Sequence, residues 1–316
     1  MPKLIDVHGH FVPQIYLDAL EKHNCLLADR FPPPVWNPEK HEQFIEDMNI
    51  AWSLFSLSSP NPYFGDTLEC KELCRAINEE ASAFKKKHPG KVGFNAVLPL
   101  PDVDAAIEEA KYALDHLNAD GIKFASNTAG QYLGDPALDP LFEELDRRGV
   151  ITNIHPTKPV PIQQNVFSAG PVSLYEFIAD TTRCVMNMIA NGVLERYPNV
   201  KVIVPHNGSF LPNIYNRFQG LLAILGPKGL MPNIDVKANF AKLYFDCAGH
   251  PVPLIDFLLT CTDVDHILYG SDFPYTGLPE MKHNIELMEE RYGNSDQFDL
   301  DKIYYKNAEK LFGIEV

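Results

Sequence analysis

Short apolar stretches alternate with helical patterns along almost the whole chain, and this alternation is the strongest constraint on its fold. Eight stretches rich in β-branched and aromatic residues are separated by segments with apolar residues at helical spacing. The predicted strands are Leu4–His8, Ala51–Leu57, Val92–Leu98, Gly121–Phe124, Val150–His155, Val200–His206, Leu243–Cys247 and His266–Gly270. The predicted helices are Leu68–Lys87, Val103–Leu117, Leu138–Arg148, Leu174–Arg196, Leu211–Ile224, Val252–Thr260 and Asp301–Phe312.

This order of elements predicts parallel strands joined by right-handed crossovers. Parallel strands covered on both faces read as continuous apolar runs, as these do. Eight repeats favour a closed (β/α)8 TIM barrel of the α/β class, with an open doubly wound sheet as the alternative. No G-x-G-x-x-G sequence follows the first strand, which weakens a dinucleotide-binding form of the open sheet. We expect residues 1–316 to form a single domain.

Two connections are longer than the bare repeat requires. Residues 13–46 follow the first predicted strand, and residues 157–172, with three prolines, follow the fifth. Long loops in a compact domain are usually lids or pocket walls. Because both leave the carboxyl ends of strands, where barrel active sites lie, we expect them to border the site.

Charge and composition exclude several classes of function. The formal net charge of −15 argues against nucleic-acid binding and against binding to anionic membranes, but it is compatible with a small anionic substrate held by a local cation. No apolar run is long enough to span a bilayer, and the first residues carry no signal-peptide pattern. The six cysteines are scattered, as is typical of reduced thiols. We therefore expect a cytoplasmic protein.

Histidines and an aspartate fall at the carboxyl ends of four predicted strands. His8 and His10 close the first, His155 the fifth and His206 the sixth, while Asp272 follows the eighth. Residues two apart in a strand point to the same side, and a closed barrel brings its strand ends together. Three imidazoles and a carboxylate suit one divalent ion, with zinc expected first and manganese or iron as alternatives. His206 then remains for proton transfer or for holding a catalytic water.

Two other residues, Lys123 and His41, allow more than one interpretation. Lys123, on the fourth predicted strand, is expected to be a pocket-side lysine; the alternative is a carboxylated lysine that bridges two metals. His41 could reach the pocket, although most histidines outside the strand ends are expected to be solvated.

With these residues in hand, the chain resembles the amidohydrolase superfamily, and more narrowly its aminocarboxymuconate-semialdehyde decarboxylase-like branch. The resemblance covers nearly the whole chain. It rests on four segments: Asp6-Val7-His8-Gly9-His10, Ile154-His155-Pro156, His206-Asn207-Gly208 followed by Arg217-Phe218, and Tyr269-Gly270-Ser271-Asp272-Phe273-Pro274. It implies that His8, His10, His155 and Asp272 bind one metal, often zinc and sometimes manganese, and that His206 acts on the catalytic water or the substrate.

The resemblance also implies candidate substrate-binding residues and an assembly. Arg217 is similar to a family arginine that reaches across a dimer interface, which implies a homodimer; the alternative is a surface helix arginine. His41 follows the Trp-x-Pro segment where the family decarboxylase has an arginine, and no arginine lies between Arg30 and Arg75. Phe273, directly after Asp272, is the third candidate.

The predicted activity is nonoxidative decarboxylation of a small aromatic or muconate-like carboxylic acid. A divalent cation at the strand ends would hold the carboxylate and stabilise developing negative charge, and Asp272 or a metal-bound water assisted by His206 would supply the proton. The same residues would serve a metal-dependent hydrolase of a lactone or a related ring-cleavage product, which is the alternative. A barrel that only binds a ligand is a third class, against which the spare His206 argues.

Overall fold

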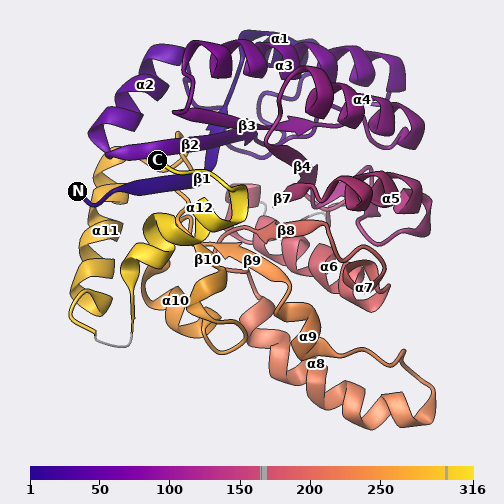
Figure 1. Cartoon of the computed structure of the whole chain (residues 1–316). Coiled ribbons are helices and arrows are strands. Elements are labelled where there is room, and N and C mark those ends of the chain that lie inside the picture. The colour runs from indigo at the N-terminus through magenta and orange to yellow at the C-terminus, as the bar shows by residue number, and fades with distance from the viewer. Residues whose placement is uncertain (164, 166–168, 296–297) are drawn as a thin grey trace.

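The computed structural model describes residues 1–163, 165, 169–295 and 298–316, and its centre is a ring of eight parallel strands (Figure 1). The strands follow one another around the ring in chain order. They are β1 (Leu4–Phe11), β2 (Ile50–Leu57), β3 (Val92–Val97), β4 (Gly121–Ala125), β7 (Ile151–His155), β8 (Lys201–Val204), β9 (Leu243–Asp246) and β10 (Ile267–Leu268). A short antiparallel pair, β5 (Asn127–Thr128) and β6 (Gln131–Tyr132), follows β4.

Main-chain hydrogen bonds close the ring between β1 and the segment that continues β10. The amide of Val7 donates to the Tyr269 carbonyl over 3.0 Å, and the amide of His10 donates to the Phe273 carbonyl over 2.7 Å. In the reverse direction, the amide of Asp272 donates to the His8 carbonyl over 2.8 Å. The predicted (β/α)8 barrel is therefore confirmed, and its closure joins two of the segments that carry predicted site residues.

Helices surround the ring on the outside (Figure 1). They are α1 (Gln14–Lys22), α2 (Pro38–Asp47), α3 (Thr67–Lys87), α4 (Val103–His116), α5 (Asp139–Arg148), α6 (Glu176–Ala190), α7 (Val193–Arg196), α8 (Leu211–Leu225), α9 (Val236–Phe240), α10 (Pro251–Leu258), α11 (Leu278–Tyr292) and α12 (Asn307–Phe312). Side chains at several amino ends explain where the helices start. Asn37, Asp66 and Asp102 each accept a hydrogen bond from the backbone amide three residues on.

Four predictions about the helices need correction. The connection after β1 contains α1 and α2, and α11 lies where no helix was predicted. The predicted helix Leu174–Arg196 is interrupted, because Gly192 adopts a left-handed conformation with φ 66° between α6 and α7. The last predicted helix begins with a π-helical turn, Lys302–Lys306, before α12. Part of the predicted long loop 157–172 lies outside the described residues.

The interior of the barrel is apolar at its amino end and polar at its carboxyl end. A cluster of buried side chains joins strands from around the ring, and α12 packs against β1 and β10 at this end (Figure 1). Its members are Ile5, Val7, Trp52, Leu54, Ile203, Leu268 and Ala308. Among the described residues, none of the helices combines the length and apolarity needed to cross a membrane.

The regular pairing of β1 with β2 is broken at the predicted metal ligands of β1. Asp6 pairs with Ser53 of β2, but Gly9 pairs with Phe55, so β1 has one residue more than β2 over this interval. Such a bulge bends a strand and changes the direction of its side chains, and bulges are common beside active sites. Here it marks the change from the apolar interior at Val7 to the polar carboxyl end at His8.

Candidate metal and active site

Three imidazole rings from two strands converge at the carboxyl end of the barrel. The Nε2 atoms of His8 and His10 are 3.1 Å apart, and the centroids of the His10 and His155 rings are 4.7 Å apart. One ring nitrogen from each of His8, His10 and His155 lies within 4.8 Å of the others. The structure therefore brings together the three histidines that the sequence singled out at the ends of β1 and β7.

The partners of the other ring nitrogens fix which atom of each imidazole is protonated. His8 Nδ1 is 2.8 Å from Asp246 Oδ2, and His155 Nδ1 is 2.8 Å from the Pro156 carbonyl. His10 Nδ1 is 3.3 Å from the Ser56 carbonyl. All three partners only accept hydrogen bonds, so each neutral ring carries its proton on Nδ1 and presents the lone pair of Nε2 to the cluster.

The donor set fits a divalent cation. Two Nε2 lone pairs only 3.1 Å apart repel each other unless a proton or a cation lies between them. Asp272 adds an anionic ligand, because its Oδ1 is 3.1 Å from His10 Nε2 and 3.7 Å from His8 Nε2. Neutral imidazole nitrogens and one carboxylate are a ligand set that zinc and manganese accept.

Burial and neighbouring charges set the protonation states of this cluster. Burial lowers the pKa of His10 and holds the pKa of His155 well below its ordinary value, so both rings are neutral. Burial alone would raise the pKa of Asp272, but the adjacent His10 and His206 rings and the charge of His8 hold it well below its ordinary value. For His8, burial lowers the pKa, yet the Asp246 carboxylate outweighs it and raises the pKa to about 9. His8 therefore releases a proton when it binds a cation.

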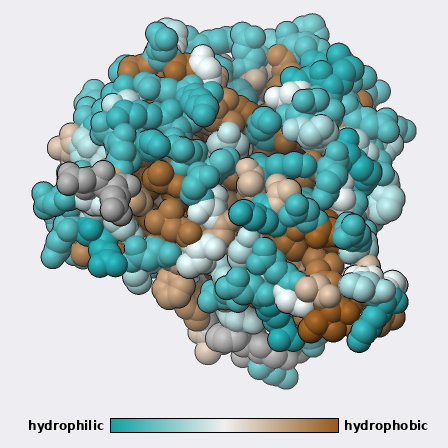
Figure 2. All heavy atoms as spheres, turned by 60° about the horizontal axis from the view of Figure 1, so that its bottom comes forward, coloured by the Kyte–Doolittle hydropathy of each residue, from teal (hydrophilic) through white to brown (hydrophobic). Residues whose placement is uncertain are grey.

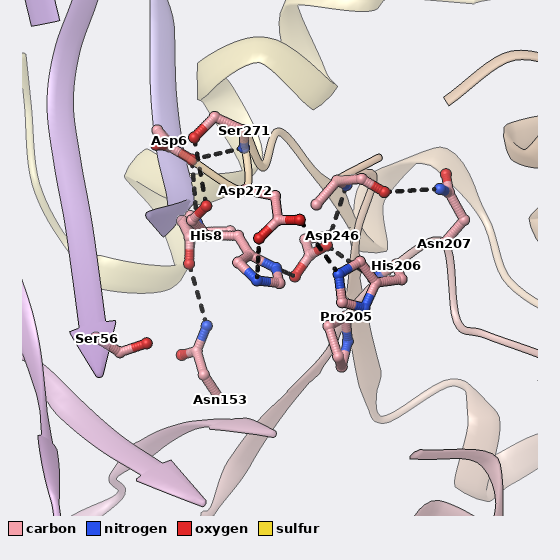
Figure 3. A network of polar contacts seen from close by, with 12 residues as sticks. Asp6, His8, Ser56, Asn153, Pro205, His206, Asn207, Asp246, Ser271 and Asp272 are labelled. Atoms are coloured by element: carbon pink, nitrogen blue, oxygen red, sulfur yellow. Dashed lines mark hydrogen bonds and ion pairs between the residues drawn. The ribbon is translucent and has the colours of Figure 1, made fainter. Parts of the chain in front are cut away.

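Two buried carboxylates hold the ligands in place (Figure 3). Asp6 accepts hydrogen bonds from the backbone amides of His8 and Ser271 over 3.1 and 2.9 Å, and from the Ser271 hydroxyl over 2.7 Å. Burial raises the pKa of Asp6 to about 6 against these hydrogen bonds. Asp246 orients His8 through Oδ2 and accepts the backbone amide of His206 on Oδ1 over 3.0 Å. Metal ligands are commonly oriented by such outer carboxylates.

The sequence analysis did not single out these two carboxylates. The available signal was positional: Asp6 precedes His8 by two residues, and Asp246 ends a buried strand. One glycine also belongs to this framework. A Cβ atom on Gly270 would lie 2.8 Å from the Cβ of His8 and 3.1 Å from that of Asp246, so a larger residue here would push the His8 ring away.

His206 lies beside the ligand cluster on a strained turn. His206, Asn207, Gly208 and Ser209 all have positive φ angles, between 53° and 71°. Strain of this kind persists where the surroundings enforce it and is common at active sites. The Nε2 atom of His206 is 3.9 Å from Asp272 Oδ2, and its buried Nδ1 has no partner among the described residues. The ring is therefore placed at the cluster with a nitrogen still available.

A cavity of about 610 Å³ opens onto the cluster. This volume lies within the range of small-molecule sites, about 300–1,000 Å³. His155, His206 and Asp272 form its polar floor. Its walls are largely apolar and include Leu26, Phe31, Pro33, Phe177, Ile178, Phe210, Leu254 and Tyr275. Residues from both predicted long loops contribute to these walls, as the sequence analysis expected.

The predicted substrate-binding residues do not line this cavity in the described part of the chain. His41 is completely buried: its Nε2 is 3.0 Å from the Ser53 hydroxyl, and burial lowers its pKa to about 3. Phe273 stacks on Phe44 with ring centroids 4.2 Å apart. Both side chains thus belong to the packing between α2 and the barrel, which the sequence pattern did not reveal. Their expected contact with substrate is at odds with this placement.

Of the two remaining candidates, Arg217 lies on the surface and Lys123 is buried. Arg217 is exposed on α8, one helical turn beyond Asn213, which does line the cavity. Lys123 is buried, and its Nζ donates to the Ser58 carbonyl over 3.3 Å. Burial lowers its pKa to about 8.

Comparison with known proteins agrees with this geometry. The amidohydrolase family model matches residues 5–314, so the chain belongs to the amidohydrolase family. The chain is 32% identical over 277 residues to 6-methylsalicylic acid decarboxylase of Penicillium expansum, covering 85% of this chain and 84% of that protein. It is 24% identical over 300 residues to 2-amino-3-carboxymuconate-6-semialdehyde decarboxylase of Dictyostelium discoideum, covering 86% and 81%. The predicted family and its decarboxylase branch are confirmed.

Solved structures show the same fold. An amidohydrolase II crystal structure has a TM-score of 0.90 and 34% identity, covering 98% of this chain and all of that one. A dihydroxybenzoic acid decarboxylase of Polaromonas sp. JS666, solved with manganese and the inhibitor 2-nitroresorcinol, has a TM-score of 0.83 at 20% identity and covers 99% of this chain and 97% of that one.

Asp246→Asn tests the outer carboxylate. The amide oxygen can still accept the backbone amides of His206 and Ala248, but its NH2 group cannot accept the proton of His8 Nδ1. We expect metal affinity to fall about 10- to 100-fold, measured by competition with a chelating dye. Asp256→Asn, which removes the charge partner of Arg291 and leaves an amide oxygen to accept from the Tyr292 hydroxyl, is the control. Unchanged affinity in Asp246→Asn would contradict the orienting role.

Proposed function

We propose that this protein is a metal-dependent nonoxidative decarboxylase of a small aromatic carboxylic acid. One observation carries the proposal: an imidazole and carboxylate cluster forms the floor of a largely apolar cavity, with His206 beside it. An apolar cavity suits a flat ring, and the polar floor suits its carboxylate. The similarity to 6-methylsalicylic acid decarboxylase supports an aromatic acid over a muconate-like one.

The cation would be held by His8, His10, His155 and Asp272. When bound, it supplies positive charge that neutralises the substrate carboxylate and stabilises developing negative charge. We propose zinc as the resident ion, because neutral imidazole donors dominate the set. Manganese is the alternative, and the Polaromonas decarboxylase was solved with it.

The reaction requires one proton at the ring carbon that loses CO2. The bond between that carbon and the carboxylate breaks, its electron pair stays on the ring carbon, and a proton takes the place of the carboxylate. Asp272 is held as the anion, so it is a poor proton store at neutral pH. His206 is the better donor, because its ring lines the cavity and its Nε2 lies beside the cluster, 3.9 Å from Asp272 Oδ2. The apolar walls exclude water from the ring carbon.

We further propose that two copies of the chain form a homodimer through α8 and α10. Large apolar side chains are exposed on these helices and on the segment after α8. They are Leu221, Ile224, Leu230, Leu254 and Phe257, and Figure 2 shows apolar surface on the side to which α8 projects in Figure 1. Exposed apolar patches of this kind often mark interfaces.

This surface is continuous with the cavity. Leu254 lines the cavity and is 40% exposed, so a second copy docked here would lie at the cavity mouth. Arg217 lies on the same helix, one turn beyond the cavity-lining Asn213. Its guanidinium would then reach the mouth of the neighbouring site and bind a substrate carboxylate through two hydrogen bonds. We also propose that the chain is a single cytoplasmic domain, in keeping with its unpaired cysteines.

Metal-loaded protein should release CO2 from one or more hydroxybenzoic or methyl-substituted hydroxybenzoic acids. His206→Ala should keep the metal and lose about 10²- to 10⁴-fold in kcat, because it removes the proton donor alone. His8→Ala should lose the metal itself. Metal content and CO2 release are measured on the same samples.

His283→Ala, an exposed histidine of α11, serves as the control and should behave as the unmodified chain. Near-normal turnover in His206→Ala would refute its assignment. Acid release from lactones without any CO2 release would favour the hydrolase instead.

Arg217→Ala tests the dimer proposal. We expect sedimentation to show a dimer for the unmodified chain and for the variant, while the KM of the variant rises at least about tenfold, because a charge-assisted contact is lost. Lys228→Ala removes an exposed cation from the turn after α8 and should leave KM unchanged. A monomer with full activity would contradict the proposal and leave the metal site untouched.

A further inference from the structure

One carboxylate in the cavity has no role in the site described so far. Asp29 lines the cavity and belongs to the segment between α1 and α2. Its Oδ1 is buried and has no hydrogen-bond partner among the described residues. A buried acceptor without a partner is costly, and at a binding site it is a position where a ligand donor is expected.

The backbone holds this side chain in place. The Asp29 carbonyl accepts a hydrogen bond from the amide of Val172 over 2.9 Å, which ties the connection after β1 to the connection after β7. Burial raises the pKa of Asp29, and the nearby Ser59 hydroxyl lowers it less strongly. The carboxylate therefore lies in surroundings that do not compensate its charge.

No cation compensates it nearby. Every lysine and arginine of the chain is among the residues that the structure describes, and none of them lines the cavity. The charges of Lys158 and Lys123 lower the pKa of Asp29, but less than burial raises it. The cavity thus contains two polar features: the proposed cation site on its floor, and the Asp29 carboxylate, whose Oδ1 has no partner among the described residues.

Tyr275 lines the same cavity as the polar floor and Asp29. Its ring is 5.5 Å from that of His10, centroid to centroid, while the charges of both Asp272 and Asp29 act on its hydroxyl. Because Asp29 and the polar floor line one cavity, a ring whose carboxylate sits on the floor can present another edge to Asp29.

We propose that Asp29 determines substrate specificity: it accepts a hydrogen bond from a hydroxyl on the far part of the aromatic ring and repels a second carboxylate there. The inference rests on the proposed function. It narrows the substrate class to aromatic monocarboxylic acids that carry a hydroxyl away from the carboxylate. Asp29 would act on binding, separately from His206, which acts on the reacting carbon.

The test is calorimetric binding to the zinc-loaded protein, with benzoate, 3-hydroxybenzoate, 4-hydroxybenzoate, isophthalate and terephthalate as probes. In the unmodified chain, at least one hydroxybenzoate should bind about tenfold or more tightly than benzoate, as expected for a hydrogen bond to a charged acceptor. Asp29→Ala should abolish this preference, and Asp29→Asn, a neutral acceptor, should retain a smaller one.

The dicarboxylates should respond in the opposite sense. Asp29→Asn should strengthen the binding of isophthalate or terephthalate about tenfold, because it removes the repelling charge without changing the shape. Asp18→Asn, an exposed residue of α1, should keep the pattern of the unmodified chain. Both Asp29 variants keep the backbone bond to Val172, and thermal unfolding checks that they fold.

The outcomes separate this inference from the proposed function. The same order of affinities in the unmodified chain and in both Asp29 variants, within about twofold, overturns the role of Asp29, as does the absence of saturable binding by every probe. CO2 release with affinities that ignore Asp29 would leave the decarboxylase standing. An affinity pattern that depends on Asp29 without any CO2 release would support Asp29 and refute the decarboxylase.

Discussion

The site depends on one constraint, which is that three imidazole rings are held close together with their Nε2 atoms directed at one cluster. His8, His10 and His155 each donate Nδ1 to a fixed acceptor, so the rings cannot turn to relieve the repulsion between their Nε2 atoms. Only a proton or a cation satisfies this arrangement, and Asp272 supplies the matching negative charge. The strained turn at His206 and the cavity floor are organised around the same point.

The closure of the barrel provides this rigidity. Asp6 binds the backbone of β1 and of the segment after β10, and the bulge in β1 aims His8 and His10 at the carboxyl end. Gly270 leaves room for His8 where any side chain would collide with its Cβ. Asp246 joins His8 to the backbone of His206, so one carboxylate positions both a ligand and the proposed proton donor. The hydrogen bonds of Asp6 and Asp246 therefore both join segments of the barrel and position the residues of the site.

Much of this could be predicted from the sequence, because strand ends meet in a barrel wherever they lie along the chain. That rule alone predicted that one site contains His8, His10, His155, His206 and Asp272. His41 and Phe273 were proposed on other grounds, and their burial depends on how α2 packs, which leaves no periodic signal in the sequence. Asp246 and Asp29 were missed for a similar reason: each is an isolated acidic residue, and only its three-dimensional surroundings distinguish it from a solvated one.

The central claim is a single cation site made by the three histidines and Asp272. It is tested most directly by stripping the protein of metal, reloading it with zinc by equilibrium dialysis, and counting tightly bound ions per chain. The account predicts one. Two tightly bound ions would mean that Lys123 completes a second site as a bridging carbamate, and none would mean that the imidazole cluster is satisfied by a proton; either result would contradict the account.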